Sequence, residues 1–181
     1  IRKTLAEFTG MPTKELVRGL DGCSAPVYAM PICNFALAIA RLCEPDTLGP
    51  EREEACNKVT SAMMHYPFMV AGPRRMDTVL MEVMEGKAIS KGGADGYQMI
   101  GIMPGALSPN SRGLGIVFKF SDGDPDRRAT HCLTTSIMTA LGFGKEMQSE
   151  AFQKMSSSTL RNWRGLEVGE IRPVNKVKLK W

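Results

Sequence analysis

The fold depends on three short segments, Lys87-Ala-Ile-Ser-Lys91, Tyr97-Gln-Met-Ile-Gly-Ile-Met103 and Gly115-Ile-Val-Phe-Lys-Phe120. Each segment is short and rich in apolar residues, and turns that contain Gly and Pro join them, which predicts three β-strands. In the third segment, large apolar side chains alternate with Val117 and Lys119. Helical patterns precede and follow the strands, so we expect an α/β sandwich in which helices pack on an antiparallel sheet.

Apolar residues at helical spacing predict the helices around this sheet. The expected helices span residues 1–8, 32–43, 50–66, 78–85, 129–141 and 146–155. Gly10 ends the first helix, Pro50 begins the third, and Pro67 ends it. We expect irregular segments at residues 18–31 and 67–77, and an edge strand at residues 177–181.

Two of these helices have a predicted inward face. In the helix at residues 32–43, the inward residues are expected to be Ile32, Phe35, Ile39 and Leu42. The helix at residues 129–141 has the clearest periodicity, with Ala129, Cys132, Leu133, Ser136, Ile137, Ala140 and Leu141 on one face. The preceding turn at residues 122–126 can also cap that helix.

Composition narrows the class of protein. The chain has 181 residues, of which 43% are hydrophobic and 23% charged, and we expect one domain over residues 1–181. The net charge of +4 comes from scattered basic residues and aromatics are only 7%, which argues against a nucleic-acid partner. The sequence contains no apolar run long enough for a membrane span and no signal-peptide pattern.

The five cysteines include no Cys-x-x-Cys pair, which favours a reducing, cytoplasmic compartment with four of the five thiols buried.

Residues 20–31 concentrate reactive side chains in a short segment. The stretch reads Leu-Asp-Gly-Cys-Ser-Ala-Pro-Val-Tyr-Ala-Met-Pro and carries Asp21, Cys23 and Ser24 around a glycine. Pro26 and Pro31 disfavour regular structure. A rigid, irregular and polar segment is better suited to holding a site than to packing a core.

Lys91 is a second candidate, at the end of a predicted strand. Gly92 and Gly93 follow it and would let a substrate approach the backbone closely. The alternative is a surface lysine beside a Gly-Gly hairpin turn.

The ordered set of motifs resembles one known family. The segments are Asp21-Gly-Cys-Ser-Ala-Pro, then Pro67-Phe-Met-Val-Ala-Gly with Arg75-Met-Asp-Thr78, and then Lys91-Gly-Gly-Ala-Asp-Gly. Phe118-Lys-Phe-Ser-Asp-Gly123 and Asn162-Trp-Arg-Gly-Leu-Glu-Val-Gly169 also fit. Together they are similar to the L-asparaginase II family, in its thermolabile, inducible rhizobial type, over nearly the whole chain.

The resemblance implies a fold and a reaction. The family is built like the serine β-lactamases and glutaminases, hydrolyses L-asparagine to L-aspartate and ammonia, and forms homodimers. Its members are longer, and the Ser-x-x-Lys pair of their first half does not occur in this sequence. We therefore expect the chain to correspond to the C-terminal half and to be inactive alone. Two alternatives remain: a non-catalytic remnant that associates with an intact subunit, and a serine hydrolase acting on glutamine or a β-lactam.

Residue roles follow from the same resemblance. Lys91 would be the general base, paired with a serine of the other half, with Gly92, Gly93 and Ser24 beside the substrate. Cys23 would be one zinc ligand, because thiolate binds zinc strongly, and Asp21 would orient that ligand or a metal-bound water. This hypothesis requires Cys23 and Lys91 to line a single cleft.

Arg75 and Asp77 would bind the two charged ends of asparagine. Arginine can grip the α-carboxylate through a bidentate pair, and a carboxylate can hold the α-ammonium group. The alternative is that Asp77 or Thr78 caps the helix that follows.

Overall fold

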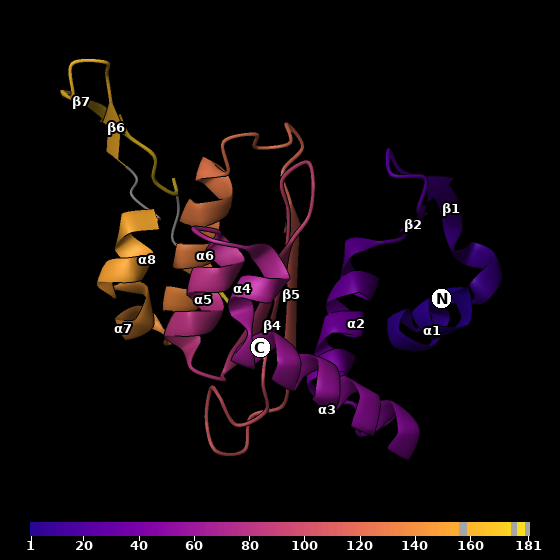
Figure 1. The fold of residues 1–181 in the computed structure, drawn as a ribbon. Helices are drawn as coiled ribbons and strands as arrows, with labels where there is room; N and C mark the ends of the chain where they lie inside the picture. Colours follow the sequence, from indigo (N-terminus) through magenta and orange to yellow (C-terminus); the bar gives the residue numbers. More distant parts are fainter. Residues whose placement is uncertain (156–158, 175–176, 180–181) are drawn as a thin grey trace.

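A three-stranded antiparallel sheet forms the centre of the computed structural model, which describes residues 1–155, 159–174 and 177–179. Its strands lie in the order β3 (Ala88–Gly92), β4 (Tyr97–Ile102) and β5 (Leu114–Lys119), as Figure 1 shows. Ile100 is the register partner of Ser90 on one side and of Ile116 on the other. The three strands predicted from the sequence are confirmed within one residue at each end.

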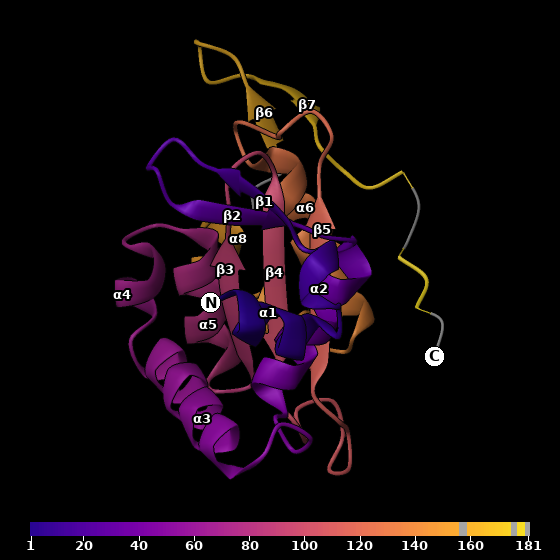
Figure 2. The ribbon, with the colours of Figure 1, turned by 90° about the vertical axis from the view of Figure 1, so that its right-hand side faces the viewer.

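Helices cover both faces of this sheet (Figures 1 and 2). One face carries α1 (Arg2–Thr9), α2 (Ile32–Cys43) and α3 (Pro50–His65). The other carries α5 (Met76–Met84), α6 (Arg128–Ala140), α7 (Gly144–Met147) and α8 (Glu150–Met155). A short helix, α4 (Pro67–Ala71), connects α3 to α5, and a 3₁₀ turn, η1 (Thr13–Glu15), follows α1. The expected α/β architecture with antiparallel strands is therefore confirmed.

The core is divided by the sheet into two apolar clusters. The larger joins α5, α6, α7 and α8 to the strands through Met76, Leu80, Met84, Ala88, Ile100, Ile102, Met138, Phe143, Met147 and Phe152. The smaller joins α2 and α5 to β3 through Cys43, Met81 and Ile89. Ala88 and Ile89 belong to different clusters because successive strand residues point to opposite faces.

Glycine lets α2 lie directly on the sheet. A Cβ atom added to Gly115 would collide with the carbonyl oxygen of Ala36 and lie 2.7 Å from the Ala40 nitrogen. A Cβ on Gly101 would collide with the Cys43 thiol. The two glycines thus bring the α2 backbone closer to β4 and β5 than any side chain would allow.

The predicted inward faces of two helices need correction. In α2, Ile39 is buried and Phe35 and Leu42 are half-buried, but Ile32 is 48% exposed, so its assignment was wrong. In α6 the buried residues are Thr130, Thr134 and Met138, whereas the predicted stripe is half-buried and Ala140 is exposed. Burial of Thr130 is possible because Asp124 accepts hydrogen bonds from its hydroxyl and its N–H, each at 2.7 Å.

Two segments expected to be irregular contain regular structure. Residues 17–29 form a hairpin of β1 (Val17–Leu20) and β2 (Pro26–Ala29), because Pro26 is the first residue of an edge strand and so needs no ladder hydrogen bond. In the second segment, α4 lies within residues 67–77, and α5 begins at Met76, two residues earlier than predicted.

The cysteines are less buried than expected. Cys43 and Cys56 are buried, and burial raises the pKa of Cys43 to about 12. Cys132 is half-buried, but Cys33 in the first turn of α2 is exposed, which corrects the expectation of four buried thiols. Cys23 is also exposed.

The C-terminal part leaves the body of the molecule. A second hairpin of β6 (Thr159–Arg161) and β7 (Glu167–Glu170) projects beyond the helices (Figures 1 and 2). Residues 177–179 are not in a strand, and Trp181 of the predicted edge strand lies outside the described residues. Within the described ranges, every helix is too short or too polar to cross a bilayer.

Candidate active site

A buried polar cluster joins α5 to the ends of β3 and β4. The Asp77 side chain, only 4% exposed, accepts hydrogen bonds at Oδ1 from the Ser90 hydroxyl and from Nε2 of Gln98, each at 2.7 Å. Its Oδ2 accepts a third bond from the backbone N–H of Gly92 at 2.8 Å. One carboxylate therefore fixes the end of β3, the start of β4 and the first turn of α5 to one another.

Strand alternation explains why these polar side chains lie inside. Ser90 follows the buried Ala88 by two residues, and Gln98 precedes the buried Ile100 by two, so all four point to the face that α5 covers. Nε2 of Gln98 also donates to the Ser90 hydroxyl at 2.9 Å. The Oε1 atom of Gln98 is buried without a hydrogen-bond partner among the described residues, which is unusual for a buried acceptor.

Arg127 covers this cluster from the loop before α6. Its Nη2 donates to the Gly93 carbonyl oxygen at 2.7 Å. A Cβ added to Gly92 would lie 2.9 Å from Nη1 of Arg127, 3.2 Å from Oδ2 of Asp77 and 3.2 Å from Oε1 of Gln98. A side chain at position 92 would therefore crowd the place where a cation and two acceptors converge on the backbone.

Lys91 points to the opposite face of β3. Its side chain is exposed and its Nζ donates to the Gly92 carbonyl oxygen at 2.9 Å. An amine that acts as a base near neutral pH is normally desolvated or placed beside another cation. The exposure of Lys91 means that a substrate or a further polypeptide segment would have to supply that burial.

Arg75 and Thr78 lie at the start of α5. Arg75 is exposed and occupies the N-cap position with extended backbone angles, and no side chain caps this helix. The Thr78 hydroxyl donates instead to the Gly72 carbonyl oxygen at 2.7 Å. The alternative prediction that Asp77 or Thr78 caps α5 is therefore wrong, because both side chains bond elsewhere.

Asp21, Cys23 and Ser24 lie together in the exposed turn between β1 and β2. Oδ1 of Asp21 accepts the N–H groups of Cys23 at 2.8 Å and of Ala25 at 2.9 Å, which closes the turn. Ser24 has a φ of +63°, a left-handed conformation that the turn imposes. Asp21 thus shapes the loop that presents the thiol.

The described residues do not form a complete zinc site. Across residues 1–155, 159–174 and 177–179, no three His, Cys, Asp or Glu side chains are grouped so that they could hold a metal ion. Cys23 offers one thiolate, whereas structural zinc takes four ligands and catalytic zinc usually three from the protein.

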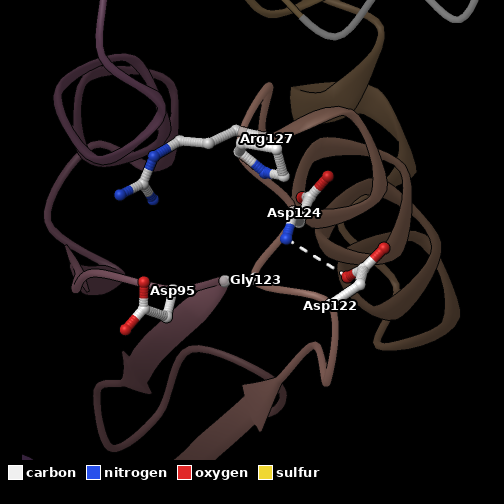
Figure 3. A pocket seen from close by; sticks show the side chains of 7 residues that line it. Asp95, Asp122, Gly123, Asp124 and Arg127 are labelled. Carbon is white, nitrogen blue, oxygen red and sulfur yellow. Dashed lines mark hydrogen bonds between the residues drawn. The ribbon is translucent and has the colours of Figure 1, made fainter.

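An acidic hollow of about 210 Å³ lies on the other side of Arg127 (Figure 3). Asp95, Asp122 and Asp124 line it, and the Asp124 N–H donates to Oδ1 of Asp122 at 3.1 Å. Burial opposes ionisation of Asp124, but hydrogen bonds from Thr130 and Ala129 hold its pKa below the usual value. Asp124 therefore caps α6, as the sequence suggested for this turn, and its oxygens are already engaged.

A larger groove of about 650 Å³ lies on the α1 and α2 face, next to the turn between β3 and β4. Its apolar walls come from α1, β2, α2 and β4, and include Ile1, Leu5, Pro26, Val27, Met30, Phe35 and Tyr97. Burial raises the pKa of Tyr97. Gly93 and Asp95 lie at its edge, but neither Cys23 nor Lys91 lines it.

The structure thus brings together only some of the predicted site residues. Asp77, Gly92 and Gly93 meet in one cluster, while Lys91 lies on the other face of β3 and Arg75 at the start of α5. Asp21, Cys23 and Ser24 share the hairpin turn, and their meeting with Lys91 in a single cleft stays a prediction. Sequence reasoning missed Ser90, Gln98 and Arg127, although polar residues at inward positions of Ile-rich strands were a usable signal for the first two.

Comparison with known proteins places this geometry in a family. The family model described as L-asparaginase II matches residues 1–173. A search of curated proteins gives no match. The family match extends from α1 through the central sheet and the hairpin of β6 and β7. The chain belongs to the L-asparaginase II family.

Proposed function

We propose that this protein is an L-asparaginase, which hydrolyses the side-chain amide of L-asparagine with water to give L-aspartate and ammonia. Family membership supports amide hydrolysis as the reaction class. The single observation that carries the proposal is the buried cluster of Asp77, Ser90 and Gln98, which with Arg127 fixes the backbone after Lys91. A rigid, glycine-lined strand end beside an amine is the arrangement that an amide substrate needs for close approach.

Lys91 is the proposed general base. Its proposed partner is a serine that lies outside residues 1–181. Amide hydrolysis needs a nucleophile, a base and donors for the developing oxyanion. The sequence lacks a Ser-x-x-Lys pair, and Ser24 lies in an exposed turn beside Asp21. We therefore expect residues 1–181 to release little ammonia alone and to become active when a segment with that pair completes the site.

Arg75 and Arg127 are the proposed partners of the substrate α-carboxylate. Nη2 of Arg127 already bonds to Gly93, whereas the Arg75 side chain is exposed to solvent. Both carboxylate oxygens of Asp77 already accept internal hydrogen bonds, three in total, so its role is to position Gly92 and Gly93. Asp21 performs a similar positioning role for Cys23 and Ser24.

Three finer features belong to the same proposal. The sheet with helices on both faces corresponds to the C-terminal half of a serine β-lactamase-like and glutaminase-like fold. The subtype is the thermolabile rhizobial one. Cys23 would supply one thiolate to a zinc site whose other ligands lie outside the described residues.

Ammonia release from L-asparagine tests the proposal. The assay compares the chain alone with the chain joined to a family N-terminal segment that carries Ser-x-x-Lys, using L-glutamine as competing substrate. Lys91→Ala should abolish turnover in the completed protein. The matched exposed control Lys58→Ala should leave turnover unchanged, because Lys58 forms an ion pair with Glu54 on the surface of α3. A folded, completed protein that releases no ammonia would overturn the proposal, and activity that survives Lys91→Ala would overturn the role of the base.

A further inference from the structure

The groove on the α1 and α2 face combines apolar walls with one charge of each sign. Its volume is about 650 Å³, and Phe35 and Tyr97 line it with their rings in edge-to-face contact, 5.8 Å between centroids. Leu5 of α1 and Val27 of β2 add aliphatic surface. Walls of this kind suit a bulky apolar group and not the short amide side chain of asparagine.

Both charged residues of the groove belong to neighbouring strand ends. Asp95 lies in the turn between β3 and β4, Lys119 is the last residue of β5, and both side chains are exposed. Nζ of Lys119 donates to the Asp95 carbonyl oxygen at 2.7 Å, which uses one of the three N–H donors of the ammonium group and leaves two for a ligand. A cation therefore lies directly beside the residue that carries the carboxylate.

The Asp95 carboxylate is available to a ligand. Among the described residues, no group donates a hydrogen bond to it and no cation forms an ion pair with it. In Figure 3 it points away from Asp122 and Asp124, the acids of the neighbouring hollow. The Gly93 N–H donates to the Tyr97 carbonyl oxygen at 2.9 Å, which holds the turn in place, so little ordering would be needed when a ligand binds.

Adjacent charges of opposite sign select a zwitterion over a simple ion. An apolar amine would meet the repulsion of Lys119, and an apolar acid would meet that of Asp95. An α-amino acid carries its ammonium and carboxylate groups on one carbon, so it can meet both residues while its side chain enters the groove. Asparagine would use the two charges but not the apolar walls.

We propose that the groove on the α1 and α2 face binds a free α-amino acid with a large apolar side chain, its ammonium group beside Asp95 and its carboxylate beside Lys119. Neither Lys91 nor Cys23 lines this groove, so the proposal does not depend on asparaginase activity. Gly93 belongs both to the groove and to the candidate active site. A bound amino acid would therefore contact the turn that follows Lys91.

Isothermal titration of the purified chain with four related molecules tests the ligand chemistry. L-Phenylalanine should bind most tightly. 3-Phenylpropionate lacks the ammonium group, phenethylamine lacks the carboxylate, and L-alanine lacks the large side chain. Each of these should bind about 5-fold more weakly or worse, a modest factor because water weakens ion pairs at an exposed rim. Absence of phenylalanine binding at millimolar concentration, or equal affinity for the first three molecules, would overturn the proposal.

Variants of the two charged residues test the location and the orientation of the ligand. Asp95→Asn should weaken phenylalanine binding by about 5-fold and should not weaken 3-phenylpropionate, which has no ammonium group to lose a partner. Lys119→Met should likewise weaken phenylalanine but not phenethylamine. An affinity for phenylalanine that is unchanged in either variant would overturn the proposal.

Two further variants separate the groove from the rest of the surface. Val27→Ser removes apolar area from the groove wall and should weaken phenylalanine and 3-phenylpropionate alike. Met69→Ala is the matched control, because Met69 is 80% exposed on α4 and does not line the groove, so binding should be unchanged. Circular dichroism checks that each variant is folded. Binding that is lost equally in all four variants would contradict a site in this groove.

Discussion

Replacing Asp77 tests whether the polar cluster holds the sheet to α5. Asp77→Ala removes the acceptor of three hydrogen bonds, two of them from the fully buried Ser90 and Gln98. The amide of Gln98 keeps its contact with the Ser90 hydroxyl, and Gly92 is half-buried so that water can reach its N–H. The Ser90 hydroxyl therefore suffers the one full loss, and the Gln98 amide, which also donates to the Met99 carbonyl oxygen at 3.2 Å, a partial one.

A buried donor left without a partner costs about 1–3 kcal/mol, so one full and one partial loss should lower the free energy of unfolding of Asp77→Ala by about 2–4 kcal/mol. For a chain of this length, that corresponds to a fall in Tm of about 10 °C. Asp77→Asn keeps an oxygen for Ser90 and Gln98 but turns an NH₂ group toward the Gly92 N–H, so the loss should be about 1–2 kcal/mol.

Urea unfolding followed by circular dichroism at 222 nm measures these values. The matched control is Glu51→Gln, an exposed acid in the first turn of α3, which should change stability by no more than about 0.5 kcal/mol. The loss in free energy of unfolding should be largest for Asp77→Ala, smaller for Asp77→Asn and smallest for the control. An Asp77→Ala protein within about 1 kcal/mol of wild type would refute the reasoning, because the three bonds would then contribute nothing net.

Three further outcomes are expected. Gly115→Val should prevent soluble expression or lower Tm sharply, because any Cβ there collides with Ala36 of α2, and thermal melts against the wild type will measure it. Thiol labelling at pH 8, read by peptide mass spectrometry, should modify the exposed Cys23 rapidly and Cys43 only on unfolding, since burial raises the pKa of Cys43 to about 12. Asp124→Asn should be less stable than wild type by about 2 kcal/mol at neutral pH. Because the folded pKa of Asp124 lies below its ordinary 3.8, that difference should be complete above pH 3.8 and disappear as the pH falls through the folded value; a constant difference down to pH 2 would contradict it.

The central sheet and the main helices could be predicted because their signals are local. The strand segments around Ile89, Ile100 and Val117 are short, apolar and bounded by glycine, and α3 begins at Pro50 and ends before Pro67. These patterns follow from backbone preferences that need no knowledge of distant contacts. The family resemblance also depended only on ordered motifs, and the family match confirms membership of the L-asparaginase II family.

The hairpin at residues 17–29 was missed because two prolines were given more weight than the turn between them. The sequence after Leu20 begins Asp-Gly, a turn signal between two strands, and Pro26 is compatible with the first position of an edge strand. All of β1 is exposed, so no inward apolar alternation marked it as a strand. The residue pattern of β1 therefore did not indicate a strand, although the Asp-Gly turn after it indicated a hairpin.

The buried face of α6 could not be predicted from apolar spacing. Thr130 and Thr134 lie inside, whereas Leu133 and Ile137 are only half-buried. The partner of the Thr130 hydroxyl is Asp124 in the preceding loop, whereas the buried Thr134 hydroxyl has no hydrogen-bond partner among the described residues. Tertiary hydrogen bonds of this kind decide the orientation of a helix whose two faces are similarly apolar.

The candidate site differs from the rest of the core because its inward side chains are polar. Removing Asp77 alone is costly because its partners stay buried, but apolar residues in place of the whole cluster would often hold a structure equally well or better. Yet Asp77, Ser90 and Gln98 occupy inward positions beside Ala88 and Ile100, in strands that are otherwise apolar on that face. The Oε1 atom of Gln98, which has no hydrogen-bond partner among the described residues, adds a further cost without a structural gain. A cluster that packing does not require, placed directly behind the glycines that follow Lys91, is best explained by the chemistry proposed for that strand end.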